Sequence, residues 1–427
     1  MSLTIRLNAQ KATAWTLARC GDPLVQVLLR EHSDDPYAAY ERMRAKGQVC
    51  HSPVGVHAVL SHELSAKLLK DPRFGVRKAD GELTGKRDVS RLALHNLGDS
   101  LLLKDAPDHN RLRQLIAPYF RPKLMKAYTE RVEQIANRLL DEAGDDFDLL
   151  ADFAQPLPLR VIADLLGIDD DAHDELARLQ EHGNVIALAC DGVRSIAQLR
   201  DYEAARAELH ALLRELLDRR REDPRDDMMT ALVRAQDAGE ITAGEAVVNG
   251  ETLFLAGFET TANLIGNAVV TLLNNRDQWE LLLDDRDLVP NAVDEVLRFE
   301  PSTHLSLRVA HEDVEIGGKL IKKDSEVVIV RAAANRDPEV FENPHQFDIT
   351  RERKGHLTFA GGAHYCLGAM LAKMEAEAAL RVLLERAPRL SLTGAVRWQR
   401  RSNLRALEAL PVSTGLGPVS KSVRAIR

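Results

Sequence analysis

One long helix constrains the fold of this chain more than any other feature. It begins at Thr242-Ala-Gly-Glu245, a capping box in which the Thr side chain and the Glu carboxylate each satisfy a free backbone N–H group. The largely apolar run that follows predicts a helix to about Asn275. About thirty residues at 1.5 Å rise make a rod roughly 45 Å long. Such a rod crosses a whole domain, so other elements must bury most of its faces.

The other segments predict a mainly α fold with small β-sheets. Ala, Leu, Glu and Arg dominate at three- and four-residue apolar spacing, and aromatic residues are only 4% of the chain. Strands are predicted in three places: in 48–60, broken at Pro53 and Gly55; in 309–330, around a Gly317-Gly318 turn; and around 404–412.

No repeat, low-complexity tract or long linker divides the 427 residues. We therefore predict an N-terminal extension over 1–34 and a single domain over 35–427. The segment 75–99 lacks periodicity and is predicted to be a long loop, a candidate lid.

Composition excludes several classes of function. The net charge of -8 gives no basic excess for nucleic acid. Polar residues interrupt the first 23 positions every few residues, so we expect no signal or membrane span and a cytoplasmic protein. The four cysteines form no C-x-x-C pair, which argues against a disulfide framework or a zinc ribbon.

Near the C-terminus, a Gly-rich loop with one cysteine, HLTFAGGAHYCLG, opens into an amphipathic helix. Free N–H groups at a helix start favour a thiolate, and glycine tolerates the positive φ of a tight loop. Cys366 has two plainer interpretations. It is a single buried cysteine, or it forms a zinc site with His364. The zinc site lacks two further ligands nearby.

The order Phe, Gly, His, Cys, Gly in this loop resembles the haem-binding loop of the cytochrome P450 family. The resemblance implies haem b, with Cys366 as the metal ligand, Phe359 beside the sulfur, His364 at a propionate and Gly368 in the loop. The family usually has glycine directly after the Phe, whereas this chain has Ala360.

A polar cluster interrupts the long helix at LFLAGFETTANLIG. Burying Glu259 and Thr260 costs free energy unless they are used or satisfied. By resemblance, Ala256 and Gly257 make room for dioxygen, and Glu259 and Thr260 are catalytic residues that direct protons. The plainer interpretation is a solvated acid and a packing threonine.

Further segments fit the same family. Glu295 and Arg298 lie at i, i+3 and can pair on one helix face. The resemblance adds Arg351 to this structural network. It also implies that His109, Arg113 and Arg308 bind the haem propionates, for which Arg is the natural bidentate partner.

The resemblance implies a triangular-prism fold and a monooxygenase that inserts one oxygen atom of O2 into an organic substrate. Electrons are expected from a ferredoxin and a ferredoxin reductase, and the chain is expected to be a monomer. A proximal docking patch is predicted around Arg111, Arg121, Lys123 and Lys126.

The substrate is expected to be a lipophilic small molecule, because the candidate pocket is largely apolar. That pocket is predicted from the 75–99 loop, the 185–193 stretch and the following side chains: His95, Leu253, Phe258, Thr303, His304 and Leu305. His304 could equally be a satisfied histidine. A non-catalytic haem protein and a peroxygenase are the rival functions, and the Glu259-Thr260 pair weighs against both.

Overall fold

A computed structural model describes residues 2–29, 35–86 and 88–415 of the chain. Its centre is α12 (Ala243–Asn274), a helix of 32 residues. Both halves of the predicted capping box are present, with Glu245 N–H donating to Thr242 Oγ1 and Thr242 N–H donating to the Glu245 carboxylate. The helix prediction is therefore confirmed within one or two residues at each end.

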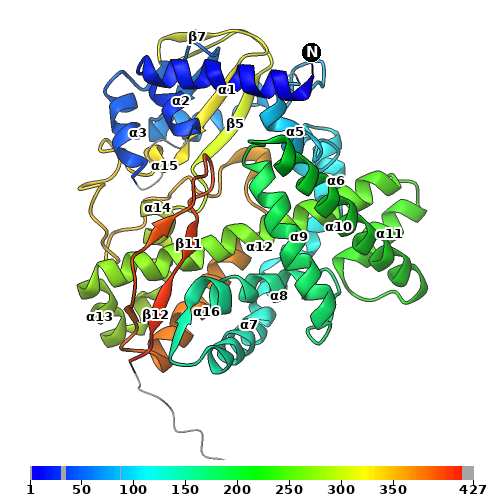
Figure 1. Cartoon of the computed structure of the whole chain (residues 1–427), viewed down its shortest axis with the longest axis vertical. Helices are drawn as coiled ribbons and strands as arrows, with labels where there is room; N and C mark the ends of the chain where they lie inside the picture. Colours follow the sequence, from blue (N-terminus) through cyan, green and yellow to red (C-terminus); the bar gives the residue numbers. More distant parts are fainter. Residues whose placement is uncertain (1, 30–34, 87, 416–427) are drawn as a thin grey trace, which may run out of the picture.

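The position of α12 explains its apolar sequence. Figure 1 shows it crossing the middle of the molecule, with helices on one side and a sheet with its covering helices on the other. By length and composition α12 could cross a membrane, but 72% of its most apolar 18-residue window is buried inside the molecule. It is accordingly the core helix of this fold.

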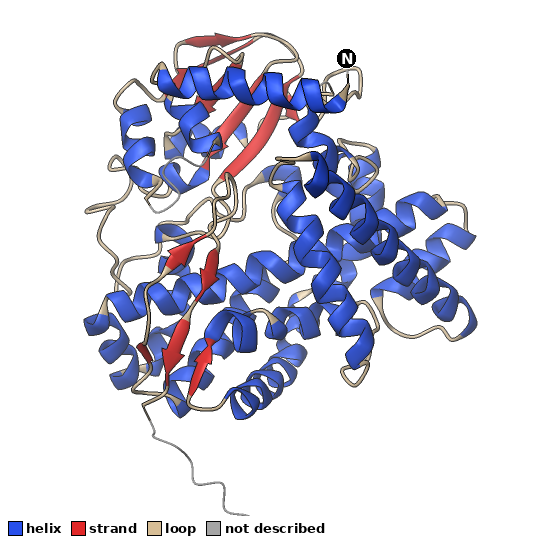
Figure 2. Ribbon diagram, in the orientation of Figure 1, coloured by secondary structure: helices blue, strands red, loops and turns tan. Residues whose placement is uncertain are grey.

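Helices make up most of the chain (Figure 2). The other α-helices are α1 (Leu3–Arg19), α2 (Pro23–Leu28), α3 (Tyr37–Arg44), α4 (His62–Leu68), α5 (Leu92–His95), α6 (Asp108–Ile116), α7 (Pro122–Ala143), α8 (Pro156–Leu165), α9 (His173–Cys190), α10 (Ile196–Glu222), α11 (Met228–Asp237), α13 (Arg276–Asp284), α14 (Val289–Phe299), α15 (Arg331–Ala334) and α16 (Ala369–Arg386). A π-helical turn, η4 (Leu150–Ala154), precedes α8.

The strands of the described residues are short and form four small sheets. They are β1 (Val49–His51), β2 (Val56–Val59), β3 (Phe74–Gly75), β4 (Asp146–Asp148), β5 (Leu305–Ala310), β6 (Val314–Ile316), β7 (Lys319–Ile321), β8 (Glu326–Val330), β9 (Ser391–Leu392), β10 (Arg397–Trp398), β11 (Leu407–Ala409) and β12 (Pro411–Ser413). All three predicted strand regions contain strands. Gly317 and Gly318 both have positive φ, as a tight β6–β7 turn requires.

The largest sheet has the order β1-β2-β8-β5-β3. β2 and β8 are parallel, and the other pairs are antiparallel. One apolar cluster joins this sheet to the N-terminal helices, and it includes Leu24 and Val27 of α2 together with Ala58 and Val328. The predicted boundary after residue 34 lies outside the described residues, but α2 on its N-terminal side shares a core with the sheet.

The predicted long loop over 75–99 is only partly correct. Its second half carries a 3₁₀ turn, η1 (Val89–Arg91), followed directly by α5. The Asp88 side chain caps η1, and Gln10 of α1 accepts a hydrogen bond from Val89 N–H at 3.1 Å. Local capping and a contact from α1 therefore give this segment structure that its sequence periodicity does not reveal.

Candidate functional site

The cysteine loop leads directly into α16. Cys366 N–H donates to Phe359 O at 3.0 Å, which closes the loop on itself. The Cys366 side chain has exposed surface but lies deep in the molecule, and this burial raises the pKa of its thiol. The Gly368 N–H group and the positive charges of Arg331 and Arg113 act in the opposite direction. The expected support from the helix start is present, but burial outweighs it.

The cysteine loop contains three glycines, Gly361, Gly362 and Gly368, and only Gly362 has a positive φ. Gly362 has a φ of +66°, and a Cβ there would collide with the Leu69 carbonyl of the neighbouring segment. Gly361 is extended and Gly368 has a φ of -86°. Instead, Ala360 takes the left-handed conformation with a φ of +58°. The tight turn thus begins one residue before the first glycine.

The four predicted propionate-binding donors are His109, Arg113, Arg308 and His364, called here the anion clamp. The His109 and His364 rings lie 4.3 Å apart, and Arg113 donates to Tyr365 O at 2.9 Å. A carboxylate beside His364 belongs to Asp105, which sequence reasoning missed. Its oxygen is 3.8 Å from His364 Nε2, and it accepts the N–H groups of Val76 and Arg77.

The clamp has donors that the protein leaves unused. His109 is 1% exposed, and its Nε2 has no hydrogen-bond partner among the described residues. Arg308 is 6% exposed, and within the described ranges its guanidinium donates only to the neighbouring Leu307 carbonyl. Burial lowers the pKa of Arg308. A buried cation needs an anionic partner. The set fits haem b, because a thiol can ligate iron and these side chains can bind two propionate carboxylates.

The predicted proton-handling residues lie in the middle of α12. Ala256 is exposed although Leu253 and Phe254 just before it are buried, so α12 borders open space here. Thr260 Oγ1 donates to Ala256 O at 2.7 Å, so its hydroxyl proton bonds back to the helix. A Cβ on Gly257 would approach Ile162 to 2.9 Å. Close packing against α8 therefore favours glycine at this position.

Glu259 has a partner that the sequence did not reveal. Arg401, from the loop between β10 and β11, donates to Glu259 Oε1, and the two side chains are 5% and 13% exposed. Burial raises the pKa of Glu259, and the positive charge of Arg401 partly offsets this rise. The plainer interpretation of Glu259 as a solvated acid is wrong. No spacing rule links positions 259 and 401, so only the fold brings them together.

The Arg401 loop is fixed by the turn that follows α9. Asp191 accepts the N–H groups of Ser402 and Asn403, both at 2.8 Å. Asn403 in turn accepts the N–H of Leu305 at 2.8 Å. One loop therefore connects the end of α9, the start of β5 and the acid of α12.

Glu375 is a second acid that sequence reasoning missed. It lies on α16, is 1% exposed and has one carboxylate oxygen without a partner among the described residues. Burial raises its pKa well above the usual range. Asn263 of α12 also has a buried amide nitrogen without a partner there. The only sequence signal for Glu375 was an acid among apolar residues on an amphipathic helix.

The expected charge network lies beside the site. Glu295 and Arg298 form two hydrogen bonds of 2.7 Å each, and Arg351 Nε is 3.3 Å from the same carboxylate. Arg298 also donates to three backbone carbonyls, those of Asn335, Pro344 and Gln346. These bonds tie α14 to the chain segment before the cysteine loop.

Two predicted pocket residues belong to the core instead. Phe258 is 1% exposed and stacks on Phe254 at 5.7 Å. His304 is 3% exposed and bonds to the Tyr40 hydroxyl at 2.7 Å, so its Nδ1 is satisfied. Both were predicted from proximity in sequence to pocket segments, whereas packing turns them away.

The remaining candidates take different positions. Leu253 is buried, whereas His95, Thr303 and Leu305 are half-buried. Burial lowers the pKa of His95.

The predicted docking patch also needs one correction. Arg111 pairs with Glu245 at 2.6 Å and with Asp108 at 3.1 Å, so it secures the start of α12. Arg121, Lys123 and Lys126 at the start of α7 are exposed.

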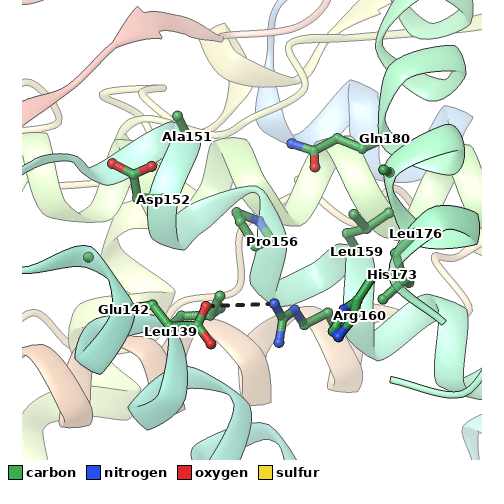
Figure 3. A pocket seen from close by; sticks show the side chains of 12 residues that line it. Leu139, Glu142, Ala151, Asp152, Pro156, Leu159, Arg160, His173, Leu176 and Gln180 are labelled. Carbon is green, nitrogen blue, oxygen red and sulfur yellow. Dashed lines mark ion pairs between the residues drawn. The ribbon is translucent and has the colours of Figure 1, made fainter. Parts of the chain in front are cut away.

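A separate pocket of about 390 Å³ lies among α7, α8, α9 and η4 (Figure 3). Arg160 and Glu142 face each other there at 3.8 Å. It contains none of the predicted site residues. Within the described residues, no group of three or more His, Cys, Asp or Glu could hold a metal ion.

Comparison with known proteins gives a single family. Residues 194–387 match the family model described as Cytochrome P450. The 6-deoxyerythronolide B hydroxylase of Saccharopolyspora erythraea is 42% identical over 332 residues, which are 76% of this chain and 79% of that protein. The biotin biosynthesis cytochrome P450 of Bacillus subtilis is 36% identical over 393 residues, covering 90% of this chain and 97% of that protein.

A solved structure agrees over nearly the whole fold. P450BioI in complex with acyl carrier protein ligated to hexadec-9Z-enoic acid has a TM-score of 0.82 at 34% identity. The similarity covers 90% of this chain and 99% of that one.

Proposed function

The chain belongs to the cytochrome P450 family of haem-thiolate monooxygenases, and on that premise we propose which of its residues perform the reaction, on what substrate and with which electron donor. The observation that carries the proposal is the combination of Cys366, just before α16, with a clamp of donors in which, among the described residues, His109 Nε2 has no partner and Arg308 forms no ion pair. In the overall reaction, a C–H bond, dioxygen, two electrons and two protons become an alcohol and water.

Haem b, when bound, supplies dioxygen activation and oxygen transfer. Cys366 would ligate its iron and Phe359 would shield the sulfur. His109, Arg113, Arg308 and His364 would hold the propionates, with Gly368 N–H directed to the sulfur.

Proton delivery belongs to Glu259 and Thr260. Because Arg401 holds the Glu259 carboxylate, Glu259 must exchange this ion pair for a water before it moves a proton. Thr260 must likewise turn its O–H away from Ala256 O, where it now donates. Ala256 keeps side-chain bulk small where α12 borders open space, whereas the missing side chain of Gly257 makes room for Ile162 of α8. In this structure both groups are therefore bonded to protein partners that they must leave before they can transfer a proton.

We propose a lipophilic small molecule as the substrate. Two relatives support this class: one is named a 6-deoxyerythronolide B hydroxylase, and the other is solved with a carrier protein bearing a long-chain fatty acid. Leu253, Thr303, Leu305 and His95 remain the candidate contacts.

A ferredoxin, reduced by its reductase, is the proposed electron donor. Exposed Arg121, Lys123 and Lys126 lie within three residues of exposed, apolar Leu124 in the sequence, and Tyr365 next to Cys366 is also exposed. A basic rim with an apolar centre suits an acidic partner. We also propose a cytoplasmic monomer.

The first test is the spectrum of the dithionite-reduced protein with carbon monoxide. A strongly red-shifted Soret band is expected for the native protein and for Cys190→Ala, since Cys190 is a non-ligand cysteine. Cys366→Ala should lose that band. A Cys366→Ala protein that retains the thiolate spectrum would exclude Cys366 as the ligand.

A second test separates the monooxygenase from a peroxygenase. In Thr260→Ala, oxygen consumption should continue while product falls and hydrogen peroxide accumulates. Thr252→Ala is the matched control, because Thr252 Oγ1 makes the same bond to Val248 O at 2.8 Å two turns earlier on α12. Equal coupling in the two variants would refute the role of Thr260.

A further inference from the structure

Arg401 carries a guanidinium that the protein uses only in part. Its side chain is 5% exposed, and within the described ranges its one hydrogen bond runs from Nη1 to Glu259. The Nε atom is buried and has no partner in that part of the chain. Nε and Nη2 together form the edge of a guanidinium that binds a carboxylate through two parallel hydrogen bonds. Among the described residues this edge is unused, and a buried donor without an acceptor costs free energy.

The loop that carries Arg401 runs beside the candidate substrate contacts. Leu404 pairs with Thr303 in an isolated antiparallel bridge, just before β5 begins at Leu305. Thr303 and Leu305 are both half-buried. The chain segment of Arg401 therefore lies against the part of the candidate pocket that leads into β5.

The other end of the ion pair lies on α12 where that helix borders open space. Glu259 follows exposed Ala256 by three residues, so the two share one face of the helix. Its side chain is 13% exposed. The pair of Glu259 and Arg401 thus joins the segment before β5 to the open side of α12. A substrate that contacts both elements must meet this pair.

The charges around Arg401 decide what happens when a further anion binds it. Burial raises the pKa of Glu259, Arg401 partly offsets this rise, and the negative charge of Asp191 adds to it. Cys190 at the end of α9 stays neutral, because burial raises the pKa of its thiol to about 12. A second carboxylate on Arg401 would repel Glu259 and favour its neutral form. Glu259 would then take up a proton and leave the ion pair.

We propose that the substrate is a lipophilic carboxylic acid, that Arg401 binds its carboxylate through the Nε–Nη2 edge, and that this ion pair replaces the one with Glu259. The inference rests on the proposed role of Glu259 in proton delivery and deepens it by naming the substrate class. The released Glu259 gains a proton from water, so one carboxylate remains paired with Arg401. Binding of the acid thereby converts a fixed anion into a proton donor beside Thr260.

The test uses two pairs of probes that differ only in charge at one end: decanoate with decanol, and naphthylacetate with naphthylethanol. Their binding to the holoprotein is measured from the haem spin-state shift, and proton uptake on binding is measured with an indicator dye. Arg401→Gln removes the cation, and Arg401→Lys keeps the charge but loses the two-donor edge. Arg400→Gln is the matched control, because it removes an exposed cation from the same loop.

We expect the native protein and Arg400→Gln to bind each acid about tenfold more tightly than its alcohol, since a charge-assisted pair of hydrogen bonds forms only with the acid. Arg401→Gln should lose this preference, whereas its unchanged affinity for decanol shows that the pocket is intact. Arg401→Lys should retain part of the preference. Decanoate should take up protons in the native protein but not in Glu259→Gln, and decanol should take up none in either protein.

Equal affinities of the native protein for acid and alcohol in both pairs would overturn the acidic substrate class. A preference for the acids that persists in Arg401→Gln would overturn Arg401 as their binding residue. Decanoate binding to the native protein without proton uptake would overturn the exchange with Glu259. Failure of the proposed function is distinct, because the native protein would then lack the thiolate spectrum, or Thr260→Ala would stay coupled.

Discussion

Ala360 carries backbone strain at a single residue of the cysteine loop. Its φ of +58° lies in the left-handed region, which costs an L-residue about 1–2 kcal/mol. Ala360→Gly removes this strain but loosens the unfolded chain, at a cost of about 0.4–1 kcal/mol. We expect the free energy of unfolding to rise by about 0.5–1 kcal/mol, measured from denaturant midpoints with haem content unchanged. A lower denaturant midpoint in Ala360→Gly than in the native protein would contradict the inference that the Ala360 backbone is strained.

At the same scale, the pH dependence of turnover should report the pair of Glu259 and Arg401. Burial already raises the pKa of Glu259, and Arg401 opposes that rise. Arg401→Gln should therefore raise this pKa further, because the carboxylate loses its cation. The acidic limb of product formation should move to higher pH.

Arg400→Gln is the matched control for this prediction, because Arg400 is the exposed neighbour in the same loop. Its acidic limb should match that of the native protein. If the acidic limb of the pH profile lies at the same pH in Arg401→Gln as in the native protein, Glu259 does not deliver a proton in the rate-limiting step.

At the scale of elements, α10 and α12 are joined by a buried charge cluster. Glu251 of α12 is 0% exposed and accepts from Arg206 Nε at 2.9 Å, while His210 Nε2 is 2.8 Å from its other oxygen. Removing one partner of a buried pair leaves an uncompensated charge, which costs about 3–5 kcal/mol. Arg206→Met should lower the free energy of unfolding by about 3 kcal/mol in denaturant titration, since His210 remains.

A matched substitution on the same helix, α10, should lower the free energy of unfolding far less. Arg219→Met breaks an exposed pair with Glu175, and such pairs contribute at most about 1 kcal/mol. Adding Glu251→Leu to Arg206→Met should restore most of the lost stability, since no buried carboxylate remains. Equal losses in the Arg206 and Arg219 single variants would mean that the cluster does not hold α10 on α12.

At the scale of the whole molecule, the exposed basic residues at the start of α7 should govern reduction by a ferredoxin. Lys123→Glu with Lys126→Glu should slow reduction about tenfold at low salt, and the difference should shrink as salt screens the charges. Stopped-flow reduction with a ferredoxin measures this. Lys319→Glu on the exposed β7 strand is the control, and a similar slowing there would indicate a net-charge effect instead of docking.

The sequence by itself determined the elements and the chemistry that depend on neighbours along the chain. The capping box and the apolar run of α12, the Gly317-Gly318 turn and the i, i+3 pairing of Glu295 with Arg298 are local, so spacing predicts them. The cysteine loop was recognisable for the same reason, because the helix start after Cys366 is encoded in adjacent residues.

Only the tertiary structure decided which distant side chains meet. Arg401 reaches Glu259 from 142 positions away, Arg331 reaches Thr358 from 27, and Asp191 holds a loop more than 200 positions later. The tertiary structure also buries Phe258 and His304 in the core and pairs Arg111 with Glu245 at the start of α12. Packing selects these partners by burying apolar surface and matching charge across elements, and such long-range matches leave no periodic trace in a single sequence.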